Sequence, residues 1–218
     1  MTGKYQKIIL FANGELPGPE GIARRINEED FLIAVDGGLN HLTALGLKPN
    51  LIIGDMDSVD GELLEKFRKQ DVAIEKHPPD KDQNDLELAI QAAVKMHPKT
   101  IWIIAALGNR IDQTLANIFL LTREDLIDID THIIDGVRDL FLIRKEASIS
   151  GEKGQRVSLI PIQGPVKGIR TEGLAYPLNN ETLYPDRTRG ISNRMTDLQA
   201  RIAIENGLLL CIHKLTKP

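Results

Sequence analysis

Two aspartates separated by a single residue, Asp55 and Asp57, are the side chains whose spacing most suggests chemistry. They follow Gly54 directly behind a short apolar run, and a turning backbone there can bring both carboxylates onto one hard cation. Mg²⁺ prefers carboxylate oxygens, completed by water and by phosphate oxygens of a substrate. The alternative is a solvated turn in which Ser58 caps the following helix, because Asp and Ser both favour such positions.

A second acidic segment, from Asp80 to Glu87, precedes an apolar helical pattern. Acidic residues at this position can simply stabilise a helix N-terminus by capping it and by opposing its dipole. However, Asp82 and Asp85 are three residues apart and can share one face. Together with the first two aspartates they make four carboxylates, more than capping requires. These charges would repel one another and any phosphate unless a cation lay among them.

The third candidate segment runs from Gly108 to Asn117 and carries an arginine and an aspartate where a helix should begin. The guanidinium of Arg110 can hold phosphate oxygens in a bidentate manner, and the helix N-terminus adds backbone N–H donors. In the alternative interpretation Asp112 caps the helix and Arg110 is its surface partner. These residues alone leave both interpretations open.

The elements that must position these segments alternate along the first part of the chain. Short apolar runs rich in β-branched residues predict buried parallel strands, and apolar residues at three- and four-residue spacing predict helices that cover them. This pattern indicates an α/β domain with a mostly parallel sheet. The strands are expected at 7–12, 31–35, 51–53, 72–74, 101–106 and 131–134, and the helices at 39–45, 61–69, 85–96 and 111–122.

Polar residues follow four of these strands directly, at 11–14, 34–38, 53–58 and 106–112. Ligands of open parallel sheets bind at the carboxyl ends of the strands. We therefore expect the four polar segments to form one crevice.

The second part of the chain has a different pattern of apolar and turn-forming residues. Its apolar runs are short and are interrupted by Gly, Pro and Asn, which is typical of antiparallel β-structure. The sequence predicts an α/β domain over 1–140 and an all-β sandwich domain over 141–218. The boundary should fall between about 136 and 150, where Ala147 to Gly154 is rich in Ser and Gly. The antiparallel strands are expected at 141–143, 155–161, 166–171, 190–195, 199–205 and 208–213.

Composition excludes several classes of function. A formal charge of −4 over 218 residues argues against a general nucleic-acid binder, which needs a basic face. Neither a P-loop nor a G-x-G-x-x-G fingerprint is present, and the five histidines lack zinc-ligand spacing. With no recognisable signal peptide or membrane span, we expect a cytoplasmic protein without a membrane partner. Cys211 is expected to be a buried, inert thiol and Trp102 a core residue.

Taken in order, the motifs resemble the thiamine pyrophosphokinase family. Each motif is weak alone, but the ordered combination is specific and covers about residues 8 to 213. The motifs are D-G-G at Asp36 to Gly38, G-D-x-D-S at Gly54 to Ser58, the acidic cluster at Asp82 to Asp85, G-x-R-x-D-x-x-L-x-N at Gly108 to Asn117, G-L-x-Y-P-L at Gly173 to Leu178, and G-x-S-N at Gly190 to Asn193.

The resemblance implies an ATP- and Mg²⁺-binding α/β domain, a thiamine-binding β-sandwich, and a homodimer with shared active sites. Mg²⁺ would be held by Asp55, Asp57 and Asp85. The catalytic residues would be Asp82, Asp85, Arg110 and Asp112, and thiamine would be contacted by Asp112, Ser192 and Asn193. The nucleotide would be contacted by Asn13, Asp36, Gly37, Gly38, Ser58, Asn84, Arg110 and Gln113.

Three features depart from the family pattern. Asn84 stands where a threonine is common, Gln113 replaces a frequent histidine, and Arg194 with the charged stretch 186–189 surrounds the S-N pair. These three departures affect the identity of the organic substrate more than the type of reaction.

The implied reaction is attack of the thiamine hydroxyl on the β-phosphorus of ATP, with AMP as the leaving group. Positioning and charge neutralisation would supply most of the catalysis, and Asp82 or Asp112 would accept the hydroxyl proton. Three alternatives remain: a diphosphokinase for another hydroxymethyl heterocycle such as a pterin, a Mg²⁺-dependent phosphatase with an aspartyl nucleophile, and a nucleotide- or thiamine-binding module without catalysis.

Overall fold

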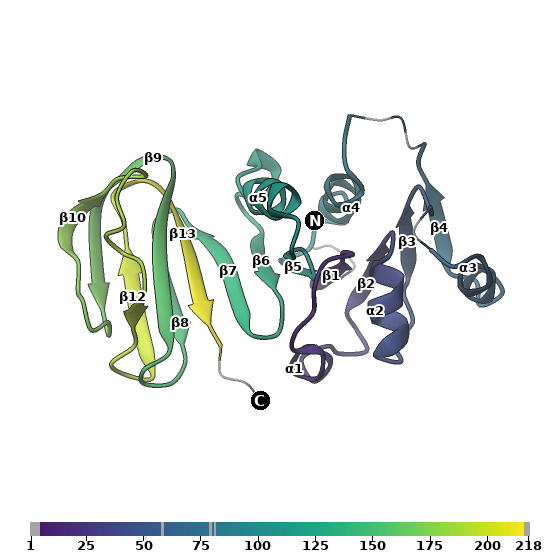
Figure 1. Cartoon of the computed structure of the whole chain (residues 1–218), viewed down its shortest axis with the longest axis horizontal. Coiled ribbons are helices and arrows are strands. Elements are labelled where there is room, and N and C mark those ends of the chain that lie inside the picture. The colour runs from purple at the N-terminus through teal and green to yellow at the C-terminus, as the bar shows by residue number, and fades with distance from the viewer. Residues whose placement is uncertain (1–4, 58, 79, 81, 216–218) are drawn as a thin grey trace. The chain divides into compact units, whose positions relative to one another are not determined.

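The chain folds into two units, which divide between Asp135 and Gly136 (Figure 1). The computed structural model describes residues 5–57, 59–78, 80 and 82–215. The division falls close to the boundary predicted between 140 and 141. Each unit has its own set of buried apolar residues.

The first unit contains a six-stranded parallel sheet in the order β4-β3-β2-β1-β5-β6. The chain moves outward from β1 to β4 and then returns to place β5 against the other side of β1. This reversal makes the β1/β5 junction the topological switch point, where open α/β sheets bind ligands. The strands are β1 (Lys7–Phe11), β2 (Phe31–Val35), β3 (Leu51–Gly54), β4 (Ala73–Lys76), β5 (Thr100–Ile104) and β6 (Asp130–Ile134).

The central strands are buried on both faces. In β1 the consecutive residues Ile8 to Phe11 are all fully buried, which a strand achieves only when both sheet faces are covered. The predicted α/β fold and its parallel strands are therefore confirmed. The helices are α1 (Pro19–Ala23), α2 (Gly38–Ala44), α3 (Gly61–Arg68), α4 (Asp85–Val94) and α5 (Ile111–Leu120), followed by the short 3₁₀ helix η1 (Glu124–Leu126).

Helices α2 to α5 occupy the segments predicted to be helical, whereas α1 was not expected. Its five residues include a proline and a glycine, and only Ile22 is buried, so no helical periodicity is visible in the sequence. In α4 the buried residues Leu86, Ala89, Ile90 and Ala93 follow the predicted spacing. No described helix is long and apolar enough to cross a membrane.

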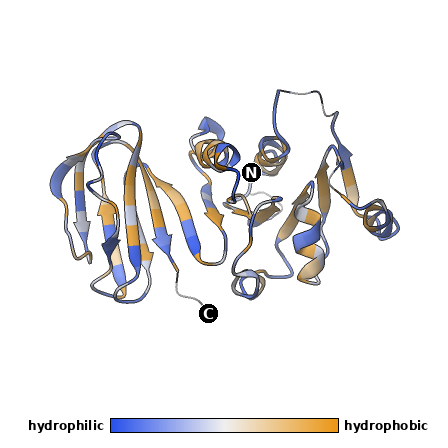
Figure 2. Cartoon of the chain, in the orientation of Figure 1, coloured by the Kyte–Doolittle hydropathy of each residue, from blue (hydrophilic) through white to orange (hydrophobic). Residues whose placement is uncertain are grey.

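The second unit consists of antiparallel strands. The long β9 belongs to two sheets: its first part pairs with β13 and β11, and its second part with β12 and β10. The apolar side chains between the sheets form the core of a sandwich, and Figure 2 shows hydrophobic residues along these strands. The strands are β7 (Arg138–Ile143), β8 (Glu146–Ser150), β9 (Arg156–Glu172), β10 (Asn179–Leu183), β11 (Asn193–Arg194), β12 (Gln199–Ala203) and β13 (Asn206–Lys214).

Details of this unit differ from the sequence prediction. The strands expected at 155–161 and 166–171 are one strand, because Gln163 and Gly164 take positive φ values of 61° and 131° and turn the chain without ending it. The segment expected to mark the boundary contains β8, in which Ile149 alone is buried. Strand β10 was not predicted, and the segment 190–195 contributes only the two residues of β11.

Cys211 is a buried free thiol, as predicted, and burial raises its pKa. Trp102 is only partly buried. Its ring lies 4.2 Å from Lys7 Nζ and 4.5 Å from the Arg25 guanidinium carbon, so it is held by cation–π contacts as well as by packing.

A buried histidine should make this protein less stable in mild acid. His213 is 3% exposed, its Nε2 lies 2.7 Å from Gln155 Oε1, and burial lowers the pKa of its imidazole although the charge of Asp139 opposes the shift. Between this lowered pKa and the usual value of 6.5, the unfolded chain binds more protons than the folded one. The free energy of unfolding should therefore fall as pH falls through that window.

Urea unfolding at several pH values between 5 and 8 measures this effect. The His213→Gln variant should show a smaller loss of stability toward pH 5 than the wild-type protein. Parallel curves for the two proteins would mean that His213 contributes nothing to the pH dependence.

Candidate active site

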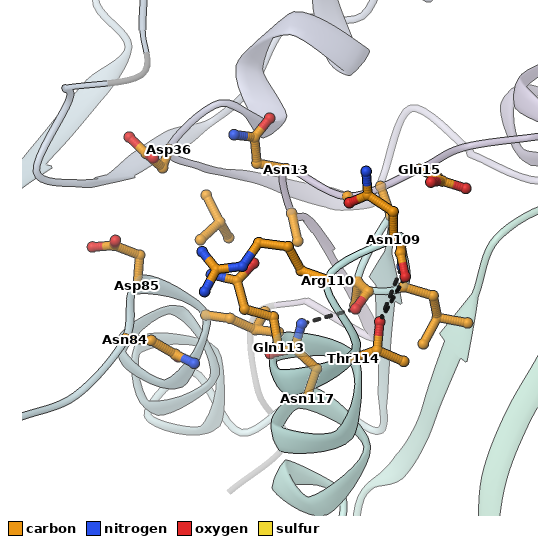
Figure 3. Close-up of a pocket in the computed structure, with 18 residues that line it drawn as sticks. Asn13, Glu15, Asp36, Asn84, Asp85, Asn109, Arg110, Gln113, Thr114 and Asn117 are labelled. Atoms are coloured by element: carbon orange, nitrogen blue, oxygen red, sulfur yellow. Dashed lines mark hydrogen bonds between the residues drawn. The ribbon is translucent and has the colours of Figure 1, made fainter.

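A polar pocket of about 480 Å³ lies at the carboxyl ends of β1, β2 and β5, beside the first residues of α4 and α5 (Figure 3). It lies at the topological switch point of the sheet, and three of the four polar strand-end segments, 11–14, 34–38 and 106–112, contribute to its lining. It is lined by Ala12, Asn13, Gly14, Glu15, Val35, Asp36, Asn84, Asp85, Leu86, Ala105, Ala106, Leu107, Gly108, Asn109, Arg110, Gln113, Thr114 and Asn117.

Backbone hydrogen bonds fix the loop that follows β1. The N–H groups of Gly14 and Glu15 donate to the carbonyl oxygens of Ala105 and Leu107, both at 2.7 Å. On the other side, His41 Nε2 lies 2.9 Å from the Gly14 carbonyl oxygen. The loops after β1 and β5 therefore form one rigid wall of the pocket.

The predicted nucleotide contacts Gly37 and Gly38 are buried behind this wall rather than in its lining. A Cβ atom at Gly38 would overlap the carbonyl oxygen of Phe11, and one at Gly37 would overlap the side chain of Asn13. In the described structure the two glycines therefore allow α2 to begin against the end of β1.

Three carboxylates converge beside the pocket. Oxygen atoms of Asp36, Asp55 and Asp57 all lie within 4.8 Å of one another. Asp36 has a φ of 49° and Met56 a φ of 70°, which are unusual for residues other than glycine, so the backbone is strained where it presents these carboxylates. The sequence motif grouped Asp55 and Asp57 with Asp85, whereas the fold adds Asp36 from the end of the neighbouring strand β2.

Electrostatic repulsion acts within this group. The pKa of Asp57 is raised mainly by its side-chain hydrogen bond with Asp55 and by the charge of Asp55, with smaller contributions from burial and from the charges of Asp36 and Asp85. Asp85 therefore lies within electrostatic range of the three carboxylates and also lines the pocket. A cation would relieve this repulsion and lower the pKa of Asp57.

The residues that precede α4 play different parts. The Oδ1 atom of Asn84 accepts a hydrogen bond of 2.8 Å from the Glu87 N–H and so caps the helix. The departure from the family threonine is therefore structurally conservative, because both residue types cap helices. Asp82 is exposed and does not belong to the described pocket lining. Ser58 lies outside the described residues.

At the start of α5, the Arg110 guanidinium donates to the Asp112 carboxylate at 2.6 Å. This hydrogen bond is the main cause of the lowered pKa of Asp112. Both side chains are about two-thirds exposed, so the ion pair is weak and Arg110 can exchange Asp112 for an anionic ligand. Arg110 and Gln113 line the pocket, whereas Asp112 lies outside its lining.

Two further α5 residues shape the pocket and were not predicted as site residues. Asn117 Nδ2 donates to the Ala106 carbonyl oxygen at 2.8 Å, and Thr114 Oγ1 donates to the Gly108 carbonyl oxygen at 3.2 Å. They hold the loop that carries Arg110. Their spacing from Arg110, four and seven residues along one helix face, is the sequence signal that could have identified them.

In the second unit, Ser192 and Asn193 lie in different environments. Ser192 is exposed with a φ of 59°, whereas Asn193 is only 3% exposed. Asn193 Oδ1 accepts from the Tyr176 N–H at 2.9 Å, and its Nδ2 donates to the Tyr176 carbonyl oxygen at 2.7 Å. The amide thus fixes the backbone of Tyr176, whose side chain is 61% exposed. Tyr176 belonged to a recognised motif but was not predicted as a site residue.

The parallel sheet, the carboxylates at its carboxyl edge and the neighbouring pocket with its arginine are typical of a transferase of the kinase class. Sequence models of one family match both units: "Thiamin pyrophosphokinase, catalytic domain" over residues 22–132 and "Thiamin pyrophosphokinase, vitamin B1 binding domain" over residues 142–209. The chain belongs to the thiamine pyrophosphokinase family.

Individual relatives agree with this assignment. Thiamine pyrophosphokinase of Bacillus subtilis is 29% identical over 85% of this chain and 88% of its own length. The crystal structure of a thiamine pyrophosphokinase from the same organism has a TM-score of 0.87 at 26% identity, covering 96% of this chain and 99% of that one. Thiamin pyrophosphokinase from Candida albicans, 17% identical, shares the fold with a TM-score of 0.83 over 96% of this chain and 90% of its own. These relatives give no support to the two alternative enzymes, a diphosphokinase for another hydroxymethyl heterocycle such as a pterin and a Mg²⁺-dependent phosphatase.

Proposed function

We propose that this chain transfers the diphosphate of ATP to the hydroxyl of thiamine, giving thiamine diphosphate and AMP. The observation that carries the proposal is the carboxylate group Asp36, Asp55 and Asp57 beside a polar pocket that contains Arg110, in a chain whose two units both match the family. The hydroxyl oxygen forms a bond to the β-phosphorus while the bond from that phosphorus to the bridging α,β-oxygen breaks.

The donor set fits Mg²⁺. It consists of carboxylate oxygens that lie within 4.8 Å of one another. Mutual repulsion would separate these oxygens if no cation were bound between them. Mg²⁺ prefers hard oxygen ligands of this kind. Asp36, Asp55 and Asp57 would hold the ion, with Asp85 close by. When bound, Mg²⁺ supplies neutralisation of phosphate charge.

The pocket residues would bind and orient ATP. Arg110 is the cation of the pocket lining, and its guanidinium suits two phosphate oxygens. Asn13, Asn84 and Gln113 supply amide donors from different sides of the pocket. Transfer of a phosphoryl-type group depends chiefly on such positioning, because little other chemistry is needed from the protein.

Of the two carboxylates proposed as proton acceptor, Asp82 and Asp112, the ion pair with Arg110 argues against Asp112. The lowered pKa of Asp112 makes it a weaker base, and its ion pair suits it to orienting Arg110. Asp82 would take the hydroxyl proton as the oxygen attacks.

On the thiamine side, the exposed ring of Tyr176 offers a flat apolar surface for a heteroaromatic ligand. Its backbone is fixed at both polar groups by the buried amide of Asn193. We therefore assign Asn193 the positioning of this aromatic side chain, and the neighbouring exposed Ser192 a polar contact with thiamine. The cytoplasmic location remains a prediction from the sequence.

The homodimer is proposed from the exposed face of α5. Ile111, Leu115 and Phe119 recur every four residues and are 71%, 51% and 50% exposed, and no residue of this fully described helix is buried. An apolar helix face of this kind marks an interaction surface, and a second copy of the chain would cover it beside Arg110.

A charge on this face should disrupt the dimer. Leu115→Glu should weaken self-association by about a hundredfold, because an unpaired carboxylate would be buried in the interface. Ile127→Glu is the matched control, since Ile127 is also 51% exposed but lies outside α5. Sedimentation equilibrium measures both. Equal association of the two variants would place the interface elsewhere.

The proposed reaction is tested by incubating the protein with ATP, Mg²⁺ and one acceptor at a time, and separating the products by chromatography. Thiamine should give equimolar AMP and thiamine diphosphate. Consumption of a pterin alcohol instead would favour the other diphosphokinase, and release of phosphate from a phosphomonoester would favour the phosphatase. Binding of ATP or thiamine without AMP would indicate a binding module.

A further inference from the structure

The nucleotide pocket has two chemically different ends. Asp36 and Asp85 lie at one end in Figure 3, next to the carboxylate group proposed to hold the metal, and Glu15 lies at the other. The side chains between them include the amides of Asn13 and Asn109. The phosphates belong at the metal end, so the nucleoside must extend toward Glu15.

The place of Glu15 is set by the backbone. Its N–H donates to the Leu107 carbonyl oxygen at 2.7 Å, and the preceding Gly14 is held by Ala105 and His41. The carboxylate can therefore move only through its own side-chain rotations.

The carboxylate of Glu15 is available to a ligand. Among the residues that the structure describes it forms no ion pair, and no side chain or N–H group donates a hydrogen bond to it. An ionised carboxylate is an acceptor only, with two oxygens. It would repel phosphate, so the matching part of a nucleotide is one with two adjacent donors, and the vicinal hydroxyls of ribose have that form.

We propose that Glu15 accepts hydrogen bonds from the 2′- and 3′-hydroxyls of the nucleotide and so selects ribonucleotides over deoxyribonucleotides. The assignment rests on the proposed use of ATP at this pocket. Carboxylates bind ribose in the same way in dinucleotide-binding sheets, which also place the ligand at a switch point. Glu15 is a specificity-determining residue in this scheme, and the base lies against the amide side chains.

The test removes one partner at a time, from the protein or from the nucleotide. The kcat/KM for ATP, 2′-deoxy-ATP and 3′-deoxy-ATP is measured with the wild-type protein and with Glu15→Ala. Wild-type protein should prefer ATP by about tenfold over either deoxynucleotide, as expected for a charge-assisted hydrogen bond at a partly solvated site. Glu15→Ala should lose about a hundredfold with ATP, because both hydrogen bonds are lost, and about tenfold with each deoxynucleotide, which keeps one of the two hydroxyls.

Glu28→Ala is the control, because it removes the same charge from an exposed turn of the same unit and should keep the wild-type preference. Absence of discrimination in the wild-type protein, or an equal loss with all three nucleotides in Glu15→Ala, would overturn the proposal. A changed preference between ATP and ITP with the ribose preference intact would assign Glu15 to the base instead.

Calorimetric binding of AMP and 2′-deoxy-AMP to the same proteins separates this proposal from the proposed reaction. A ribose preference that disappears in Glu15→Ala supports the role of Glu15 even if no diphosphate is transferred. Turnover of thiamine without any ribose preference supports the reaction and contradicts the role of Glu15.

Discussion

Asp57→Asn should lower turnover by about a thousandfold while leaving the fold intact. The substitution removes one carboxylate from the proposed metal site, where charge stabilisation in phosphoryl-type transfer is concentrated. Without metal, the variant should be at least as stable as the wild-type protein. The side-chain hydrogen bond with Asp55 and the charges of Asp55, Asp36 and Asp85 raise the pKa of Asp57, so its ionised form is disfavoured in the folded protein. Steady-state kinetics and urea unfolding measure the two effects.

Asp71→Asn is the matched control for this variant. Asp71 is an exposed aspartate outside the pocket with a φ of 59°, a conformation that asparagine also tolerates. It should keep wild-type turnover. If Asp57→Asn retains activity as well, the solvated-turn interpretation of the G-D-x-D-S motif is correct and the metal role is wrong.

Arg110→Ala should lower kcat/KM for ATP by about a hundredfold, because a guanidinium that holds phosphate oxygens would be lost. Arg110→Lys should recover only part of this loss, since an ammonium group cannot form the bidentate contact. The kinetics are measured at saturating thiamine so that the nucleotide dependence is isolated.

Asp112→Asn distinguishes the two interpretations of this pair. If Arg110 binds phosphate, it is freed by the loss of Asp112, and the variant should bind AMP at least as tightly as the wild-type protein. If Arg110 is only a surface partner, Arg110→Ala and Asp112→Asn should both have small and equal effects on AMP affinity.

The architecture of the first unit is well encoded in the sequence. Short, β-branched apolar runs such as 7–12 and 101–106 are typical of strands buried on both faces, and the structure has β1 and β5 there. The second unit is less predictable, because pairing partners rather than local patterns decide its strands. Strand β8 has one buried residue, Ile149, and exists through its pairing with β12.

The sequence predicted individual residues of the site but not which carboxylates lie together. The polar strand ends identified Asn13, Asp36 and Arg110, and the polar segment before α4 identified Asn84 and Asp85. All five residues line the pocket. The grouping of Asp36 with Asp55 and Asp57 depends on the order of neighbouring strands, which the sequence motif does not contain.

The burial of Asn193 could not be predicted either, because it also depends on residues that are distant in the sequence. Its amide is used by Tyr176, seventeen positions away along the chain, and no local pattern reveals such a partner. Glu15 was missed because a single glutamate after a strand has no distinctive spacing, and only the shape of the pocket selects it.

The most direct test of the central claim follows the γ-phosphate of ATP. The protein is incubated with γ-³²P-labelled ATP, Mg²⁺ and thiamine, and the labelled products are separated. Transfer of an intact diphosphate predicts that the label appears in thiamine diphosphate, with one AMP formed for each labelled product. Label in inorganic phosphate or in thiamine monophosphate, with ADP in place of AMP, would contradict it.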